Sequence, residues 1–213
     1  MSDRAGWAVL GAGGISSDFL RALPAAQLGT LRAVGARDAG RARAFADGFA
    51  ADFPDAAAGT YDEVLARDDV DAVYTGTVHT SHRELSLAAL AAGEAVLCEK
   101  PLGIDVAETE QILAAAQAAG LPLVEAFKYR FGPFPDRVRE LVAGGDLGEI
   151  VEVEASIGFA ADRGIARLFD PALAGGALLD AGCYAVSFAV GVAAWAGRLG
   201  ASIPTVVSAT GVI

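Results

Sequence analysis

The sequence predicts an α/β fold, in which a doubly wound parallel sheet comes first and an incomplete α+β domain follows. Three observations lead to this prediction. Over the first 125 residues, short apolar runs alternate with helical patterns, as in repeated β-α-β units. A glycine-rich turn at 11–16 directly follows the first apolar run. After residue 126 this regular alternation of apolar runs and helical patterns ends. We therefore expect one domain at 1–125 and a second, partial one at 126–213.

The elements of the first domain follow from short, continuous apolar runs, which suit strands that are covered on both faces. We expect strands at 7–10, 31–36, 72–75, 95–98 and 121–125. Helical patterns lie between these runs, at 15–23, 40–49, 81–92 and 106–119. Strands and helices that alternate in this way indicate a parallel sheet.

The second part of the chain has fewer elements. We expect a helix at 136–142, a helix at 178–194 and a β-rich run at 204–213. Between the helices, residues 150–159 include the alternating run Val, Glu, Val, Glu, Ala, Ser, Ile, which predicts a strand with one solvated face. A part with only two strands does not make an independently stable domain, and an apolar run at 206–213 would form an exposed edge. We therefore expect the chain to be cut short.

Composition excludes several classes of function. The chain has 213 residues, of which 54% are hydrophobic and 20% charged, so we expect a packed core and no disorder. The net charge of −11 repels phosphate backbones and argues against nucleic acid as a partner. The apolar stretch at 185–196 is too short and too rich in glycine to span a membrane. No signal peptide is evident, and we expect a cytoplasmic protein.

The two cysteines, Cys98 and Cys183, are far apart in the sequence. No CxxC motif or Cys/His cluster accompanies them, which argues against a zinc site and against a disulfide framework. We interpret both as small buried hydrophobic residues. The histidines His79 and His82 lie three residues apart, but without a third ligand we expect no metal site.

The turn after the first strand has the G-x-G-x-x-(small) pattern of a dinucleotide-binding Rossmann fold. Gly11 permits the tight turn, Gly13 lets the backbone approach a pyrophosphate, and Ser16 is small enough for close packing of helix on strand. Gly14 and Ile15 open the helix, whose free N–H groups and positive dipole favour phosphates. The alternative is a turn that is merely rich in glycine.

The second strand ends at Ala36 and Arg37, where an NAD site usually carries an acidic residue for the ribose hydroxyls. A guanidinium at this position suits the 2′-phosphate of NADP. We therefore expect NADP as the cofactor, with NAD as the alternative. Arg37 could also be a plain surface charge, and Asp38 could cap the next helix.

Four motifs occur in order and together resemble the Gfo/Idh/MocA oxidoreductases. They are the glycine-rich turn at 11–16, Thr77-Val-His79-Thr-Ser-His82, Glu99-Lys100-Pro101, and Gly175-Gly176-Ala-Leu-Leu-Asp180-Ala-Gly182-Cys-Tyr184. Two further segments, 125–131 and 167–171, are most similar to the branch that includes dimeric dihydrodiol dehydrogenases and NADP-dependent xylose dehydrogenases. Relative to this family the chain is short at its C-terminus.

The resemblance implies a catalytic group of Lys100, Tyr184 and Asp180. Lys100 follows a parallel strand, so it is aimed at the cofactor cleft, where its charge could polarise a carbonyl or stabilise an alkoxide. A free tyrosine has a pKa of about 10, which a nearby ammonium would lower. Tyr184 would then exchange the hydroxyl proton. Asp180, four residues earlier on the same predicted helix, would bind substrate or orient Lys100. Without the resemblance, capping and packing roles would be preferred.

The resemblance also places Thr77, His82, Glu99 and Lys100 on the cofactor side of the cleft. Arg130, beside Tyr129, resembles a cofactor-facing residue at the domain junction, and packing in the hinge is the alternative. Val78 stands where the family commonly has proline. Together these residues predict an NADP-dependent oxidoreductase that acts on a hydroxyl carbon of a sugar or cyclic diol, with a homodimer formed through the C-terminal sheet.

Two other functions remain open at this stage. One is a methyltransferase with a glycine-rich first loop, against which Arg37 argues, because an adenosine ribose prefers an acid at that position. The other is a non-catalytic NAD(P)-binding protein, or an inactive truncated fragment of such an enzyme.

Overall fold

The computed structural model describes residues 4–27, 29–198, 208 and 210, and it divides the chain into two compact units. The first unit contains Met1–Ala126 and Arg163–Gly176, and the second contains Phe127–Asp162 and Ala177–Ile213. The sequence assigned the segment Arg163–Gly176 to the second domain, but it belongs to the first unit. One contact that holds it there joins Nδ1 of His79 to the carbonyl oxygen of Ala174, at 3.2 Å.

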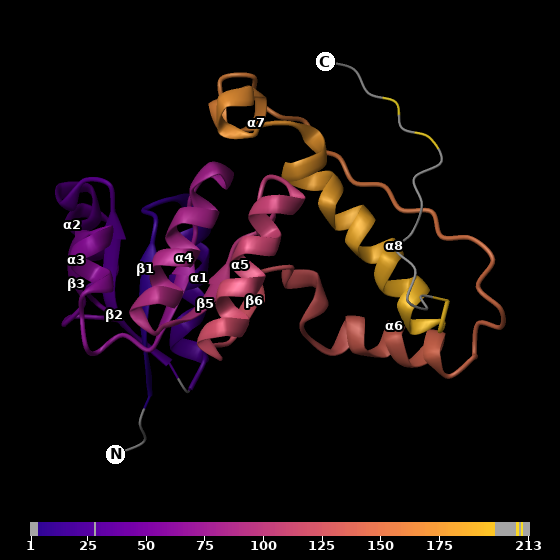
Figure 1. Ribbon diagram of the computed structural model, residues 1–213, viewed down its shortest axis with the longest axis horizontal. Coiled ribbons are helices and arrows are strands. Elements are labelled where there is room, and N and C mark those ends of the chain that lie inside the picture. Colours follow the sequence, from indigo (N-terminus) through magenta and orange to yellow (C-terminus); the bar gives the residue numbers. More distant parts are fainter. Residues whose placement is uncertain (1–3, 28, 199–207, 209, 211–213) are drawn as a thin grey trace. The chain divides into compact units, whose positions relative to one another are not determined.

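The first unit is built on one sheet of six strands, in the order β3-β2-β1-β4-β5-β6 (Figure 1). All five strand pairs are parallel, which confirms the predicted doubly wound α/β fold. The order reverses between β1 and β4, and ligands of such sheets bind outside the carboxyl ends of the strands at this reversal. The strands are β1 (Ala5–Leu10), β2 (Gly29–Ala36), β3 (Ala57–Thr60), β4 (Ala72–Thr75), β5 (Ala95–Cys98) and β6 (Leu123–Glu125).

Helices cover both faces of this sheet, because successive residues of each strand point to opposite sides. Ala8 and Leu10 of β1 belong to one buried cluster, together with residues of α3, α4 and α5. Val9 and Tyr74 belong to the other cluster, together with residues of α1 and α2. The helices are α1 (Gly14–Ala22), α2 (Ala39–Asp47), α3 (Tyr61–Leu65), α4 (His82–Ala92) and α5 (Val106–Ala119).

Every strand and helix expected in the first domain is present, and two short ones were missed. Strand β3 has the sequence Ala-Ala-Gly-Thr, which lacks the large apolar residues that mark a buried strand. Helix α3 has only five residues and begins with a capping box, in which Thr60 and Glu63 bond each other's backbone N–H groups. Cys98 is fully buried, and burial raises the pKa of its thiol to about 12, consistent with the expected packing role.

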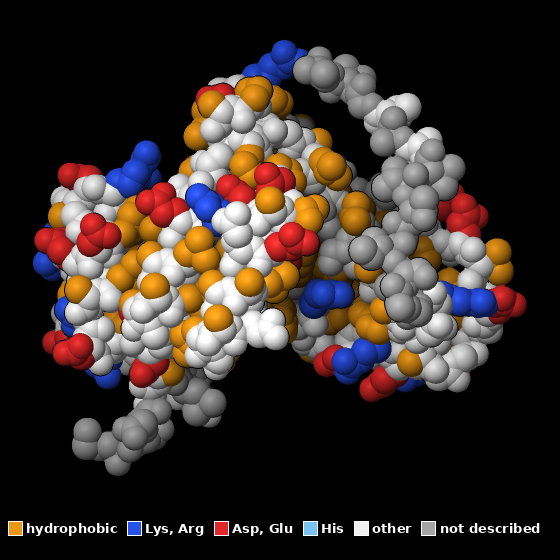
Figure 2. Space-filling view, viewed as in Figure 1, with side chains coloured by type: hydrophobic (Ala, Val, Ile, Leu, Met, Phe, Trp, Pro, Cys, Tyr) orange, Lys and Arg blue, Asp and Glu red, His pale blue; other side chains and the backbone are white. Residues whose placement is uncertain are grey.

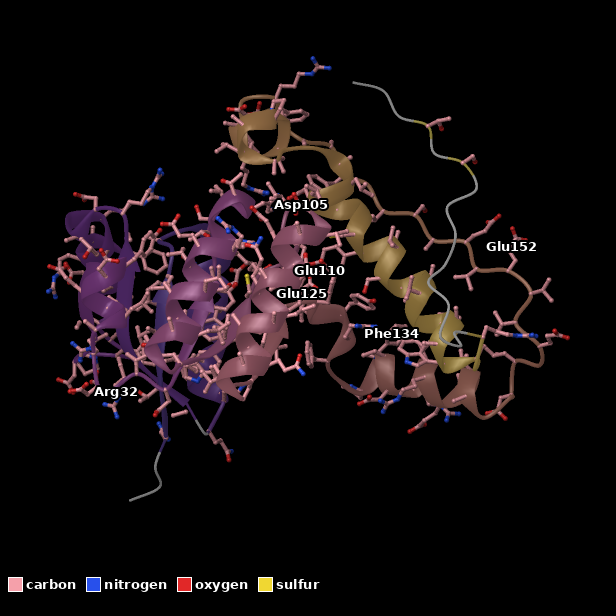
Figure 3. The ribbon with its side chains drawn as sticks, viewed as in Figure 1. Arg32, Asp105, Glu110, Glu125, Phe134 and Glu152 are labelled. Atoms are coloured by element: carbon pink, nitrogen blue, oxygen red, sulfur yellow. The ribbon has the colours of Figure 1, made fainter. Side chains whose placement is uncertain are left out.

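The described part of the second unit is helical. Helix α6 (Pro133–Ala143) contacts α8 (Cys183–Trp195), and a π-helical turn at Leu178–Gly182 leads into α8. The strand expected at 150–159 is wrong, because this segment has no regular secondary structure; Glu152, labelled in Figure 3, lies within it. Within the described residues of this unit no second strand pairs with it, and an unpaired strand leaves its backbone groups unsatisfied. Except for 208 and 210, the run at 204–213 lies outside the described residues.

One helical run, Pro171–Trp195, is long and apolar enough to cross a membrane by length and composition alone. It is longer than the stretch that the sequence singled out, and by itself it is weak evidence for a membrane span. The run also contains two residues with left-handed backbone, Ala174 at a φ of 54° and Gly176 at a φ of 137°. These residues interrupt the helix before the π-helical turn begins.

Acidic and basic side chains are interspersed over the face of the first unit that Figure 2 shows. One acidic side chain, Glu94, is instead buried. It is only 2% exposed at the amino end of β5, and neither of its carboxyl oxygens has a hydrogen-bond partner among the described residues. Burial raises the pKa of Glu94 from 4.5 to about 7, because the ionised carboxylate loses its hydration.

We expect Glu94 to make stability decrease with pH. Below pH 4.5 the carboxyl is protonated in both the folded and the unfolded chain, so the folded protein keeps the full free energy of unfolding associated with a neutral Glu94. Between pH 4.5 and about 7 only the unfolded chain ionises, so the free energy of unfolding falls, by up to about 3 kcal/mol. Glu94→Gln keeps the shape and cannot ionise. Urea unfolding at pH 5, 6.5 and 8 measures the free energy of unfolding of both proteins. The difference between the variant and the parent should grow in favour of the variant as pH rises. A difference that stays constant over the three pH values would contradict this expectation.

Candidate functional site

The turn between β1 and α1 can be built only with glycine at its first position. Gly11 has a φ of 109°, which other residues rarely adopt, and its N–H donates to the carbonyl oxygen of Gly35 at 2.9 Å. A Cβ atom at Gly11 would lie 2.5 Å from the carbonyl oxygen of Gly76. The turn is therefore held between the ends of β2 and β4, as the predicted role of Gly11 requires.

The next two glycines face open space. A Cβ at Gly13 would meet a single atom within 4 Å, at 3.8 Å, and one at Gly14 would meet none. Gly13 is the N-cap of α1 and no side chain caps the helix there. Ile15, at the second position of α1, is 37% exposed. A phosphate group could thus approach the backbone and the positive end of the helix.

Ser16 packs α1 closely against the end of β4. Its side chain is completely buried and its hydroxyl donates to the carbonyl oxygen of Gly76 at 3.4 Å. A Cβ at Gly76 would lie 2.4 Å from that hydroxyl oxygen, so both residues must be small. The close packing of helix on strand predicted for Ser16 is therefore present.

Two arginines lie beyond the end of β2. Arg37 is the first residue after the strand and is exposed. Arg41, on α2, donates from Nη2 to the carbonyl oxygen of Ala12 in the glycine-rich turn, at 3.0 Å. Burial raises the pKa of Tyr61, and the positive charges of Arg37 and Arg41 act in the opposite direction. Asp38 accepts from the N–H of Arg41 and caps α2, one of the roles that the sequence left open.

Lys100 lies just after β5 in a tightly held turn. The carboxylate of Glu99 accepts from the hydroxyl of Tyr74 at 2.8 Å and from the N–H of Lys100 at 3.3 Å. The peptide bond between Lys100 and Pro101 is cis. The N–H of Leu102 donates to Oε1 of Glu125, 2.8 Å away at the end of β6. The backbone on both sides of Lys100 is therefore fixed by carboxylates from β5 and β6.

The loop after β4 carries Thr77 and leads to His82, the first residue of α4. The His82 ring is fully buried, with Nδ1 2.7 Å from the carbonyl oxygen of Pro101 and Nε2 3.3 Å from that of Thr77. Burial lowers the pKa of His82. The rings of His79 and His82 are 5.8 Å apart at their centroids, and no metal-binding group of three or more His, Cys, Asp or Glu side chains occurs among the described residues.

The other predicted catalytic residues lie in the second unit. Asp180 is in the π-helical turn and Tyr184 is in the first turn of α8. The Tyr184 ring packs edge to face against Phe127 and Tyr129, with centroid distances of 5.4 and 6.0 Å. The hydroxyl groups of Tyr129 and Ser187 are 2.9 Å apart. An aromatic cluster thus fixes the start of α8.

The π-helical turn at Asp180 was not expected. A regular helix was predicted over 178–194, whereas the turn at Leu178–Gly182 is wider and often occurs at functional positions. Arg130 also lies beside α8, because a Cβ at Gly191 would be 3.5 Å from its Nη2. Its predicted contact with the cofactor stays a prediction.

The first unit therefore collects most of the predicted cofactor residues at one edge of its sheet. They follow β1, β2, β4 and β5, which are adjacent strands, and parallel strands have their carboxyl ends on the same edge. These residues are Gly11, Gly13, Gly14, Ile15, Arg37, Thr77, His82, Glu99 and Lys100. Sequence reasoning missed Arg41, Tyr74 and Glu125, since only the fold brings them to this edge.

Two family models match the chain. Residues 5–127 match "Oxidoreductase family, NAD-binding Rossmann fold", and residues 136–212 match "GFO/IDH/MocA C-terminal domain". Among curated proteins, trans-1,2-dihydrobenzene-1,2-diol dehydrogenase of Sus scrofa is 42% identical over 185 residues, which are 85% of this chain and 54% of that protein. The Homo sapiens protein of the same name is 40% identical over the same shares. The chain spans about half the length of these relatives.

Solved structures give the same relationship. GenD2 from gentamicin A biosynthesis, crystallised with NAD, has a TM-score of 0.74 and 29% identity over 90% of this chain and 54% of its own. KijD10, a 3-ketoreductase from Actinomadura kijaniata crystallised with NADP, has a TM-score of 0.61 and 34% identity over 68% of this chain and 46% of its own. Both nicotinamide cofactors thus occur among the similar structures.

Proposed function

The chain belongs to the Gfo/Idh/MocA family of oxidoreductases, and from this premise we propose that it binds NADP and oxidises a hydroxyl carbon of a sugar or cyclic diol. The observation that carries the proposal is the carboxyl edge of the sheet around β1. There the open backbone of Gly13 and Gly14 leaves room for a pyrophosphate, and Lys100 follows β5 on the same edge.

The preference for NADP over NAD rests on Arg37 and Arg41. Both guanidinium groups act on Tyr61, the first residue of α3, and Arg41 also contacts the glycine-rich turn. A ribose 2′-phosphate at this end of the sheet would be met by two positive charges. The nearest acidic side chain in sequence, Asp38, is engaged as the cap of α2.

The bound nicotinamide supplies the hydride chemistry, and the residues of the chain position the substrate and move its proton. Lys100 places a positive charge beside the substrate oxygen, where it stabilises a developing alkoxide. The Tyr184 hydroxyl group exchanges the proton of the substrate hydroxyl, and Asp180 binds substrate or orients Lys100. Glu99 is unsuited to act as the base, because its carboxylate already accepts hydrogen bonds from Tyr74 and Lys100.

The substrate class is proposed from the relatives. The mammalian relatives are named for a cyclic diol, and KijD10 is described as a 3-ketoreductase. Both descriptions fit interconversion of a secondary alcohol and a ketone. We also propose that the protein forms a homodimer through its C-terminal part, and that it acts in the cytoplasm without nucleic acid or membrane partners.

A second candidate function is cofactor binding without catalysis. The segment 150–159 favours it, because the strand expected there as part of the substrate domain is absent from the described structure. In that case the first unit would bind the dinucleotide as proposed, while turnover of alcohols would be missing.

The cofactor proposal predicts saturable binding of NADPH that is tighter than binding of NADH. Energy transfer from tryptophan to the reduced nicotinamide measures both affinities. Arg37→Ala and Arg41→Ala should each weaken NADPH binding by about tenfold or more and change NADH binding little, because each removes a charge-assisted bond to the 2′-phosphate. Arg43→Ala, an exposed arginine on the same helix, is the matched control. Equal losses for both cofactors would contradict the assignment of these arginines.

The catalytic proposal predicts that Lys100→Met and Tyr184→Phe each lower kcat by about 100-fold or more, because each removes a group that acts on the transition state. The dissociation constant for NADPH should change by less than about threefold. The assay follows NADPH formation from trans-1,2-dihydrobenzene-1,2-diol and from a panel of aldoses. Binding of NADPH without turnover of any alcohol would favour the non-catalytic alternative.

A further inference from the structure

The imidazole of His82 joins two loops at the carboxyl edge of the sheet. It comes from the first turn of α4, after β4, and its Nδ1 lies 2.7 Å from the carbonyl oxygen of Pro101, after β5. Its Nε2 lies 3.3 Å from the carbonyl oxygen of Thr77. The residue is 0% exposed, so no atom of the ring is available to a ligand in the cleft.

The hydrogen bond to Pro101 has one possible direction. A carbonyl oxygen only accepts, so Nδ1 must carry the proton and donate it. Burial lowers the pKa of His82, because the doubly protonated ring loses its hydration, although the hydrogen bonds to Pro101 and Thr77 act in the opposite direction. The contact of Nδ1 with Pro101 is the shorter of the two that the ring makes, and Nε2 lies 3.3 Å from the Thr77 carbonyl oxygen in the loop after β4.

This bond completes the support of Lys100. Glu99 bonds the N–H of Lys100 from within the turn. Glu125, which is labelled in Figure 3, bonds the N–H of Leu102 from the end of β6. Both accept from N–H groups, whereas His82 holds a carbonyl group and does so from the opposite neighbour, the loop after β4. His82 thus adds a bond from α4 to a carbonyl group of the turn, beside the bond that Tyr74 of β4 makes to Glu99.

We propose that His82 is a positioning residue, whose Nδ1–H group fixes the Pro101 carbonyl and thereby the direction in which Lys100 leaves β5. The inference deepens the proposed function and rests on it, since Lys100 is the residue that His82 would position. It replaces the direct contact with the cofactor that the family resemblance implied for His82. A buried ring that bonds two loops acts on the site through them.

Two variants separate the hydrogen bond from the packing of the ring. His82→Leu fills much of the space and removes the donor. His82→Asn carries an amide nitrogen close to the place of Nδ1 and can keep the bond to Pro101. Leu85→Ala opens a cavity in the same helix at a buried residue and is the matched control for lost stability.

The first experiment measures amide hydrogen exchange of the turn at 99–103 in the protein without ligand. We expect His82→Leu to speed exchange there by about tenfold relative to the rest of the sheet, and His82→Asn to restore most of the protection. Leu85→Ala should speed exchange evenly across the unit. Equal protection of the turn in the parent and in both His82 variants would overturn the proposal, as would a loss no larger than that of Leu85→Ala. If His82→Leu does not fold, the asparagine variant decides: unchanged protection supports the bond, and protection lost in the turn alone overturns the proposed donor geometry.

The second experiment separates this inference from the proposed function. With trans-1,2-dihydrobenzene-1,2-diol and NADP⁺, His82→Leu should lower kcat by about tenfold or more, and the dissociation constant for NADPH should stay within about threefold. A loss of NADPH binding with unchanged kcat would instead assign His82 to the cofactor site and overturn the positioning role. If the parent chain turns over no alcohol, the proposed function fails, while the exchange data still decide whether His82 holds the turn.

Discussion

The close approach of the glycine-rich turn to the end of β4 is the constraint on which the rest of the site depends. Gly11 and Ser16 both contact Gly76, and a single Cβ at either glycine would come within 2.5 Å of the atoms opposite. This contact sets the start of α1 against the strand where the order of the sheet reverses. The turn packs against Gly76 at the end of β4, whereas the backbone of Gly13 and Gly14 has open space beside it.

The position of Lys100 follows from the same arrangement. Strand β5 pairs with β4, so the turn after β5 comes next along the edge that starts at the glycine-rich turn. Side chains from three further elements hold that turn. Tyr74 of β4 donates to Glu99, Glu125 of β6 accepts from the N–H of Leu102, and His82 of α4 bonds the carbonyl oxygen of Pro101. These side chains can hold the backbone of Lys100 in place without contacting a ligand themselves. Preorganised positive charge is effective only when the backbone that carries it does not move.

The first unit could be predicted from the sequence because its strands are continuous apolar runs and its turn has a defined spacing. The strands at Ala72–Thr75 and Ala95–Cys98 have the predicted bounds. Prediction failed where local signals were weak or where a partner was needed. Strand β3 has only small residues, and residues 150–159 alternate like a strand but have nothing described to pair with. The hydrogen bonds of Arg41 to Ala12 and of His82 to Pro101 join residues 29 and 19 positions apart, which no local pattern encodes.

We expect a nicotinamide dinucleotide to bind along the carboxyl edge of the sheet. The most direct test is the change in backbone amide chemical shifts when NADPH is added to the ¹⁵N-labelled protein. Gly93 and Gly120 precede β5 and β6 at the opposite edge and serve as internal references. Binding at this edge should give large shifts at Gly13, Gly14 and Lys100 and none at these two references. Shifts confined to the opposite edge, or none at Gly13 and Gly14 in a folded chain, would contradict it.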